Sequence, residues 1–111
     1  MDLERAANRI DSLWIDSITD ELVEYVRIPA KSPHFDADWA ANGHIDAAVE
    51  HIVRWCRAQP IEGLAVEVVR LGDRTPVILM EVPGSLDDTV LLYGHLDKQP
   101  EMTGWAEHLG P

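Results

Sequence analysis

The run from Thr89 to Glu101, T-V-L-L-Y-G-H-L-D-K-Q-P-E, constrains the fold of this chain more than any other stretch. Its first part, Val90 to Tyr93, is an unbroken apolar run, typical of a strand buried on both faces of a sheet covered by helices. If the chain stays extended past Gly94, His95 and Asp97 project to the same side, because strand side chains alternate with period two. Open α/β sheets build their sites beyond the carboxyl ends of such strands. The sequence therefore predicts a polar site at the exit of this strand.

From the residues alone, two interpretations of this His-x-Asp pair remain open. A histidine with a carboxylate two residues on can be a metal-ligating imidazole that the carboxylate holds in orientation. The same pattern also arises where a strand simply turns polar at the surface. A second His-x-Asp, His34 with Asp36, has no apolar strand before it to fix its geometry. We interpret that second pair as a loop feature without a metal role.

The longer string Y-G-H-L-D-K-Q-P-E-M-T-G-W, from Tyr93 to Trp105, resembles the first metal-binding motif of the dinuclear-zinc peptidase family. That family includes carnosinase-type dipeptidases, acetylornithine deacetylase and succinyl-diaminopimelate desuccinylase, and the Gln-Pro pair is more similar to the dipeptidase branch. The resemblance implies that His95 binds one of two zinc ions and that Asp97, the catalytic residue of this motif, steadies the imidazole without binding metal. It also implies a hydrolase acting on peptide or dipeptide amide bonds, in which a metal-bound water attacks the carbonyl.

The rest of the family's site has no counterpart in this chain. Its bridging Asp, its general-base Glu and its other ligands lie downstream of this motif, so the chain supplies at most one weak ligand set. Glu101 and Glu107 are too near His95 and outside the pattern, so neither receives a catalytic role, and substrate-binding residues are not identified. We expect residues 1–111 to be the amino-terminal part of one metallopeptidase domain, inactive alone. The alternative is non-enzymatic: a truncated remnant, or a small α/β module that binds a partner.

Helical spacing dominates the first half of the chain. Apolar residues from Asp2 to Arg27 recur at helical intervals and predict one bent helix or two, with Ser17 and Asp20 as a possible cap between them. Pro29 ends this helix, and the segment Ala30 to Gly43 is predicted to be a loop. A second helix is predicted from His44 to Arg57, capped by Asn42, on the stripe Ile45, Ala48, Val49, Ile52 and Cys56. The same spacing places His44 and His51 on one face, which we interpret as solvated surface histidines.

Strand signals follow. Leu64 to Val68 alternates, Val77 to Val82 is nearly continuous in apolar character, and Gly72-Asp73 between them predicts a hairpin. With Val90 to Tyr93 as a buried third strand, the pattern predicts an α/β fold. The resemblance implies that it is the amino-terminal part of a zinc-peptidase-like, three-layer α/β sheet domain, still incomplete. An incomplete sheet leaves an edge open, so we expect self-association through that exposed edge.

Composition excludes several classes of function. The 111 residues suit one small domain, and the net charge of −11, with nine basic residues among twenty acidic ones, argues against nucleic-acid binding. No apolar run approaches the ~20 residues of a membrane helix. The acidic start of the chain is unlike a secretory signal, so we expect a cytoplasmic protein. A single cysteine, Cys56, cannot form an internal disulfide, and its place in an apolar stripe predicts a small buried hydrophobe.

Overall fold

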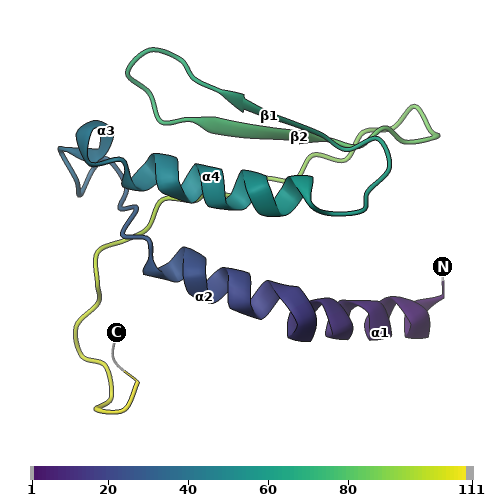
Figure 1. Cartoon of the computed structure of the whole chain (residues 1–111), viewed down its shortest axis with the longest axis horizontal. Coiled ribbons are helices and arrows are strands. Elements are labelled where there is room, and N and C mark those ends of the chain that lie inside the picture. The colour runs from purple at the N-terminus through teal and green to yellow at the C-terminus, as the bar shows by residue number, and fades with distance from the viewer. Residues whose placement is uncertain (1, 110–111) are drawn as a thin grey trace.

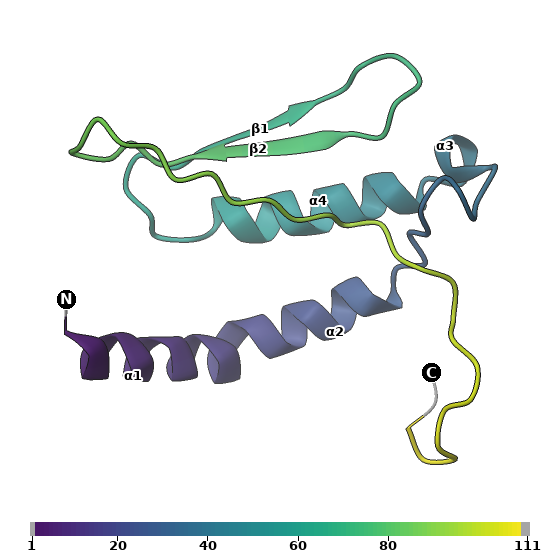
Figure 2. The same cartoon turned by 180° about the vertical axis from the view of Figure 1, so that it is seen from behind.

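The computed structural model describes residues 2–109, which form three stacked layers. Helix α4 runs between a two-stranded sheet on one side and a long helix built from α1 and α2 on the other (Figure 1). The view from behind gives the same order of layers (Figure 2). In chain order, the elements are α1 (Leu3–Leu13), a π-helical turn (Trp14–Ile18), α2 (Thr19–Arg27), α3 (Trp39–Asn42), α4 (His44–Arg57), β1 (Ala65–Val69) and β2 (Val77–Glu81).

The first helical segment is one unbroken helix in which α1 and α2 are joined by the π-helical turn. Asp2 begins it, because its carboxylate accepts a hydrogen bond from the Arg5 amide at 3.1 Å. The expected cap at Ser17 is wrong: this residue lies inside the π-helical turn, and Ile18 keeps helical angles (φ −63°, ψ −41°). A helix that does not break has no free amides there for a side chain to cap. The widened turn instead places the Ser17 hydroxyl 3.0 Å from the indole nitrogen of Trp55 on α4.

The end of α2 and the following loop agree with the sequence prediction in outline. Ile28 turns extended (φ −74°, ψ 118°) immediately before Pro29, as expected for a residue that precedes proline. The predicted loop contains one short helix, α3, that was not expected. Asp36 organises this loop, because its carboxylate accepts from the Asp38 amide at 3.1 Å and from the Asn42 side chain at 2.7 Å.

Helix α4 has the predicted bounds and carries most of the core. The cap predicted at Asn42 is wrong by one residue: Gly43 is the N-cap, with left-handed angles (φ 75°, ψ 6°), and Asn42 ends α3, although its side-chain oxygen accepts from the His44 amide at 3.0 Å. The predicted stripe is buried except for Ile52, which is half-buried, while Val53 is buried instead. Two layers cover α4 from different sides, so the buried surface is wider than one amphipathic stripe. Its buried residues are Ile45, Ala48, Val49, His51, Val53 and Cys56.

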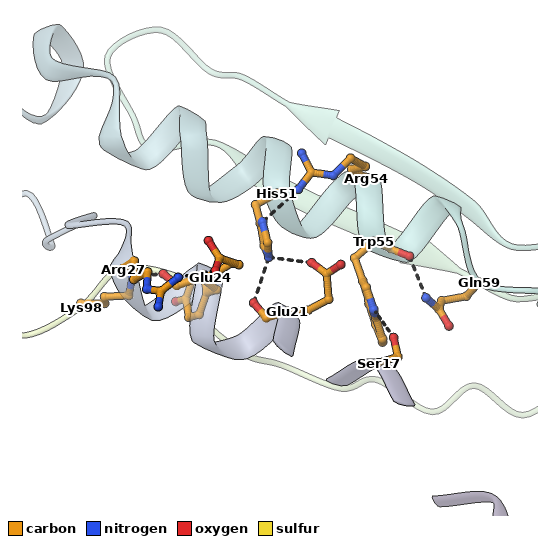
Figure 3. Close-up of polar contacts among 10 residues, drawn as sticks. Ser17, Glu21, Glu24, Arg27, His51, Arg54, Trp55, Gln59 and Lys98 are labelled. Atoms are coloured by element: carbon orange, nitrogen blue, oxygen red, sulfur yellow. Dashed lines mark hydrogen bonds and ion pairs between the residues drawn. The ribbon is translucent and has the colours of Figure 1, made fainter. Parts of the chain in front are cut away.

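His51 corrects the sequence interpretation, because it is buried rather than solvated. Arg54 donates to its Nδ1 at 3.0 Å, and a guanidinium has no acceptor, so Nδ1 is the unprotonated nitrogen of the ring. The Nε2–H then donates to the backbone oxygen of Glu21 on α2 and lies 3.0 Å from its carboxylate. Figure 3 shows the ring spanning the two helices. Periodicity within α4 could not reveal that α2 covers this face.

The predicted hairpin is confirmed. Strands β1 and β2 pair antiparallel, with Ala65 opposite Glu81 and Val69 opposite Val77. One face packs on the core of α4 through Val66, Val68 and Ile78. The alternation of apolar residues in β1 therefore marks the covered face correctly.

The predicted third strand is wrong. Val90 to Tyr93 pair with no strand of the described chain, and these residues are between 85% and 90% exposed. This segment runs along the side of the layers as single chain (Figure 2). A strand of this composition is buried only when neighbouring strands and helices cover it, and residues 2–109 provide only the two strands of the hairpin. The structure is thus mixed α/β without the buried third strand.

Exposed apolar surface extends beyond this segment. The radius of gyration is 17.0 Å, against about 13 Å for a compact chain of this length. The accessible surface is 9392 Å², against about 6,100 Å² for a compact protein of this mass.

Among the described residues, no helix combines the length and apolar character needed to cross a membrane.

Overpacking at the centre of α4 should destabilise the fold. Ala48 is fully buried, whereas Ala47 beside it on the same helix is exposed. We expect Ala48→Leu to lower the free energy of unfolding by about 1–3 kcal/mol, because the added atoms have no space. Ala47→Leu, the matched control, should change it by less than about 0.5 kcal/mol. Urea unfolding followed by circular dichroism measures both, and equal effects would contradict the layer arrangement.

Self-association is the second expectation. Four consecutive exposed apolar side chains and the open edges of the hairpin favour pairing between copies. At high micromolar concentration, light scattering should detect species larger than a monomer. Leu91→Asp should reduce this association, whereas Leu86→Asp adds the same charge outside the apolar run and should leave it. A monodisperse monomer at that concentration would count against the expectation.

Candidate metal centre

His95 and Asp97 lie against each other, as the sequence predicts. The Nδ1 atom of His95 is 3.0 Å from a carboxylate oxygen of Asp97 and 3.0 Å from its backbone oxygen. Both oxygens are acceptors, so Nδ1 carries the hydrogen in this arrangement. In the part of the chain that the structure describes, the other ring nitrogen, Nε2, makes no hydrogen bond. The ring therefore offers an unprotonated nitrogen while its other nitrogen is held.

The pair is open to solvent on the side of the histidine. The His95 side chain is 66% exposed, and that of Asp97 is 35% exposed. Leu96 between them points elsewhere and packs against the hydrophobic core around α4. This alternation brings the two polar side chains together even though the strand predicted to precede them does not form.

Contacts with the end of α2 hold the segment after His95. The Tyr25 hydroxyl donates to the backbone oxygen of Leu96 at 2.5 Å. Backbone bonds continue the attachment, because the Lys98 amide donates to Ala30 O at 2.8 Å and the Ser32 amide donates to Lys98 O at 2.9 Å. Sequence reasoning missed Tyr25 and Lys98. Lys98 stands inside the motif and was a visible candidate, whereas nothing in the sequence connects Tyr25 with a segment about seventy positions later.

Other candidate ligands do not join the pair. Across residues 2–109, no three His, Cys, Asp or Glu side chains converge closely enough to hold a metal ion. Glu101 forms an ion pair with Lys31 at 2.9 Å, and the hydrogen bond from Lys31 lowers the pKa of this carboxyl. His34 packs edge-on against Phe35, with ring centroids 4.9 Å apart. A complete zinc site takes about three protein ligands, so the described residues do not fit one; His95 would supply a single ligand.

Cys56 is buried in the core, as predicted. Burial raises the pKa of its thiol, because a thiolate loses its hydration there. A buried thiol with a raised pKa is a poor nucleophile and a poor metal ligand. Cys56 therefore belongs to the packing of α4 rather than to a site.

Comparison of the sequence with known protein families and with curated proteins found no match to either. The relation to the dinuclear-zinc peptidases thus stays a prediction. It depends on the residues of the motif from Tyr93 to Trp105.

Proposed function

We propose that this chain provides the histidine–carboxylate part of a zinc-dependent peptidase that hydrolyses peptide or dipeptide amide bonds. One observation carries the proposal: the 3.0 Å contact between His95 Nδ1 and the Asp97 carboxylate. In zinc sites, a ligating histidine usually donates its second ring hydrogen to a carboxylate or carbonyl, which fixes the ring and makes the free nitrogen a better ligand. The pair has that form. The motif around it supplies the class of reaction.

Each residue of the pair has one role in this proposal. His95 would offer Nε2 to one of two zinc ions, and Asp97 would hold the ring through Nδ1–H. When bound, zinc supplies a hydroxide nucleophile near neutral pH and polarises the substrate carbonyl. The described residues contribute one ligand to such a centre and no general base, so the remaining groups have to come from elsewhere. The proposal for this chain is therefore a contribution to a site.

A second candidate is a non-catalytic module that binds a partner through strand pairing. The exposed apolar run from Val90 to Tyr93 favours it, together with the unpaired edges of the β1–β2 hairpin. An extended segment with free backbone groups can add to the edge of a sheet in another protein. In this alternative, the His95–Asp97 contact is a hydrogen bond at the protein surface that binds no ligand.

Zinc titration distinguishes the two candidates. Added Zn²⁺ should shift the imidazole resonances of His95 at lower concentration than those of His34. We expect Asp97→Asn to raise the zinc concentration at half-change about tenfold, because the charge-assisted bond to Nδ1–H is weakened. Asp36→Asn makes the same change in the second His-x-Asp sequence and serves as the control. Equal responses at His34 and His95, or an Asp97→Asn protein that binds zinc unchanged, would refute the metal-ligand role.

The chain alone should not hydrolyse peptides. One imidazole cannot hold zinc in a hydrolytic geometry, so turnover of a dipeptide panel with added zinc should equal that of zinc without protein. Turnover that exceeds this blank, and that is abolished both by a chelator and by His95→Ala, would show that the described residues suffice for catalysis.

A further inference from the structure

The ammonium group of Lys98 lies at the carboxyl end of α2. Its Nζ donates to the backbone oxygen of Tyr25 at 2.6 Å and to that of Ile28. It also lies 4.1 Å from the centre of the Tyr25 ring. Both carbonyl oxygens also accept a backbone amide, Tyr25 O from Ile28 and Ile28 O from Ala30, and a carbonyl oxygen can accept a second hydrogen bond. The carboxyl end of a helix carries partial negative charge, and the face of an aromatic ring attracts cations. The two carbonyls and the ring therefore attract the ammonium group of Lys98, whereas burial lowers its pKa.

Tyr25 contacts the same segment a second time. Its hydroxyl donates to the backbone oxygen of Leu96, one residue after His95 and one before Asp97. Burial raises the pKa of this phenol, and the negative charge of Asp97 adds to the effect. The hydroxyl therefore stays protonated near neutral pH and remains a donor. Together, the side chains of Tyr25 and Lys98 hold the backbone on both sides of Asp97.

The chain before His95 has no comparable support. Val90 to Tyr93 are exposed and pair with no strand, so in the part of the chain that the structure describes no contact on that side fixes the imidazole. The geometry of the His95–Asp97 pair therefore depends on residues 96–98. These residues are held by the end of α2 and by the parallel bridge between Lys31 and Lys98. Lys98 itself lies outside the buried core cluster around α4. Loss of its contacts should therefore loosen the pair before it loosens the fold.

We propose that Lys98 and Tyr25 are positioning residues for the His95–Asp97 pair. They hold the backbone of Leu96 and Lys98 against the end of α2 as a clamp. In this way they keep the backbone oxygen and one carboxylate oxygen of Asp97 within hydrogen-bond distance of His95 Nδ1. The clamp sets which ring nitrogen carries the hydrogen and leaves Nε2 as the free nitrogen. The significance of this geometry for metal binding rests on the proposed function, whereas the geometry itself is tested without metal.

The test uses nuclear magnetic resonance on the full chain without zinc, at a single pH where the imidazole is neutral. Nitrogen shifts of His95 measure the share of the Nδ1–H tautomer, and hydrogen exchange measures the protection of the Lys98 and Ser32 amides. Lys98→Met keeps an unbranched side chain, one atom shorter, and removes its donors. We expect it to reduce amide protection about tenfold, as loss of charge-assisted bonds does, and to shift the tautomer share toward that of a solvated imidazole. Tyr25→Phe, which removes one oxygen, should change both in the same direction.

Lys31→Met is the matched control, because Lys31 pairs with exposed Glu101 and does not contact α2 carbonyls. It should leave the His95 tautomer and both amides unchanged. If Lys98→Met lost its helical circular dichroism, Tyr25→Phe would decide the question. If the share of the Nδ1–H tautomer in these variants equalled that of the wild type, even with reduced amide protection, the positioning role would be overturned. The same holds if the wild-type ring has no more Nδ1–H tautomer than a solvated imidazole. Failure of zinc to bind His95 in the wild type would instead refute the proposed function and leave the clamp standing.

Discussion

Coverage of α4 on two sides is the constraint on which the rest of this structure depends. Among the described residues, every buried side chain except Ala30 belongs to α4. The hairpin contributes half-buried valines to one side of the helix, and Tyr25 of α2 and Ile28, just after α2, cover the other. Burial of one aliphatic side chain is worth about 1.5–3 kcal/mol, so a core of this size leaves little excess stability. Any change that separates either layer from α4 should therefore affect the whole fold.

A thin core makes polar contacts important for the orientation of the layers. The α1–α2 helix keeps large apolar residues on its surface, including Ile15 and Val26, so apolar burial alone does not specify its angle on α4. Two side chains of α4 do so: His51 bonds to Glu21, and Trp55 donates to Ser17 (Figure 3). A buried hydrogen-bonding group costs free energy when its partner is lost, which favours one orientation over its neighbours. The π-helical turn contributes to this orientation because it contains Ser17, whose hydroxyl accepts the hydrogen bond from the indole nitrogen of Trp55.

Local pattern predicted the elements whose neighbours are close in sequence. The bounds of α4 follow from helical periodicity, and the pairing of β1 with β2 follows from strand periodicity and the Gly72-Asp73 turn. The failures share one cause, which is dependence on distant neighbours. Val90 to Tyr93 have the composition of a buried strand but no partner, and His51 has the spacing of a surface residue but lies under α2. For the site, sequence predicted the proximity of His95 and Asp97, but it could not predict the anchors that come from α2.

Alternation of the side chains of H-L-D-K explains how the pair forms without a strand before it. His95 and Asp97 project to one side and meet at 3.0 Å. Alternation then directs Leu96 and Lys98 to the opposite side, where one packs on the core and the other bonds to the end of α2. Four consecutive residues thus supply both the polar pair and its attachment. A sheet is one way to hold such a segment; here a lysine at a helix terminus and a half-buried tyrosine hold it, and the geometry of the pair depends on α2 as much as on the motif.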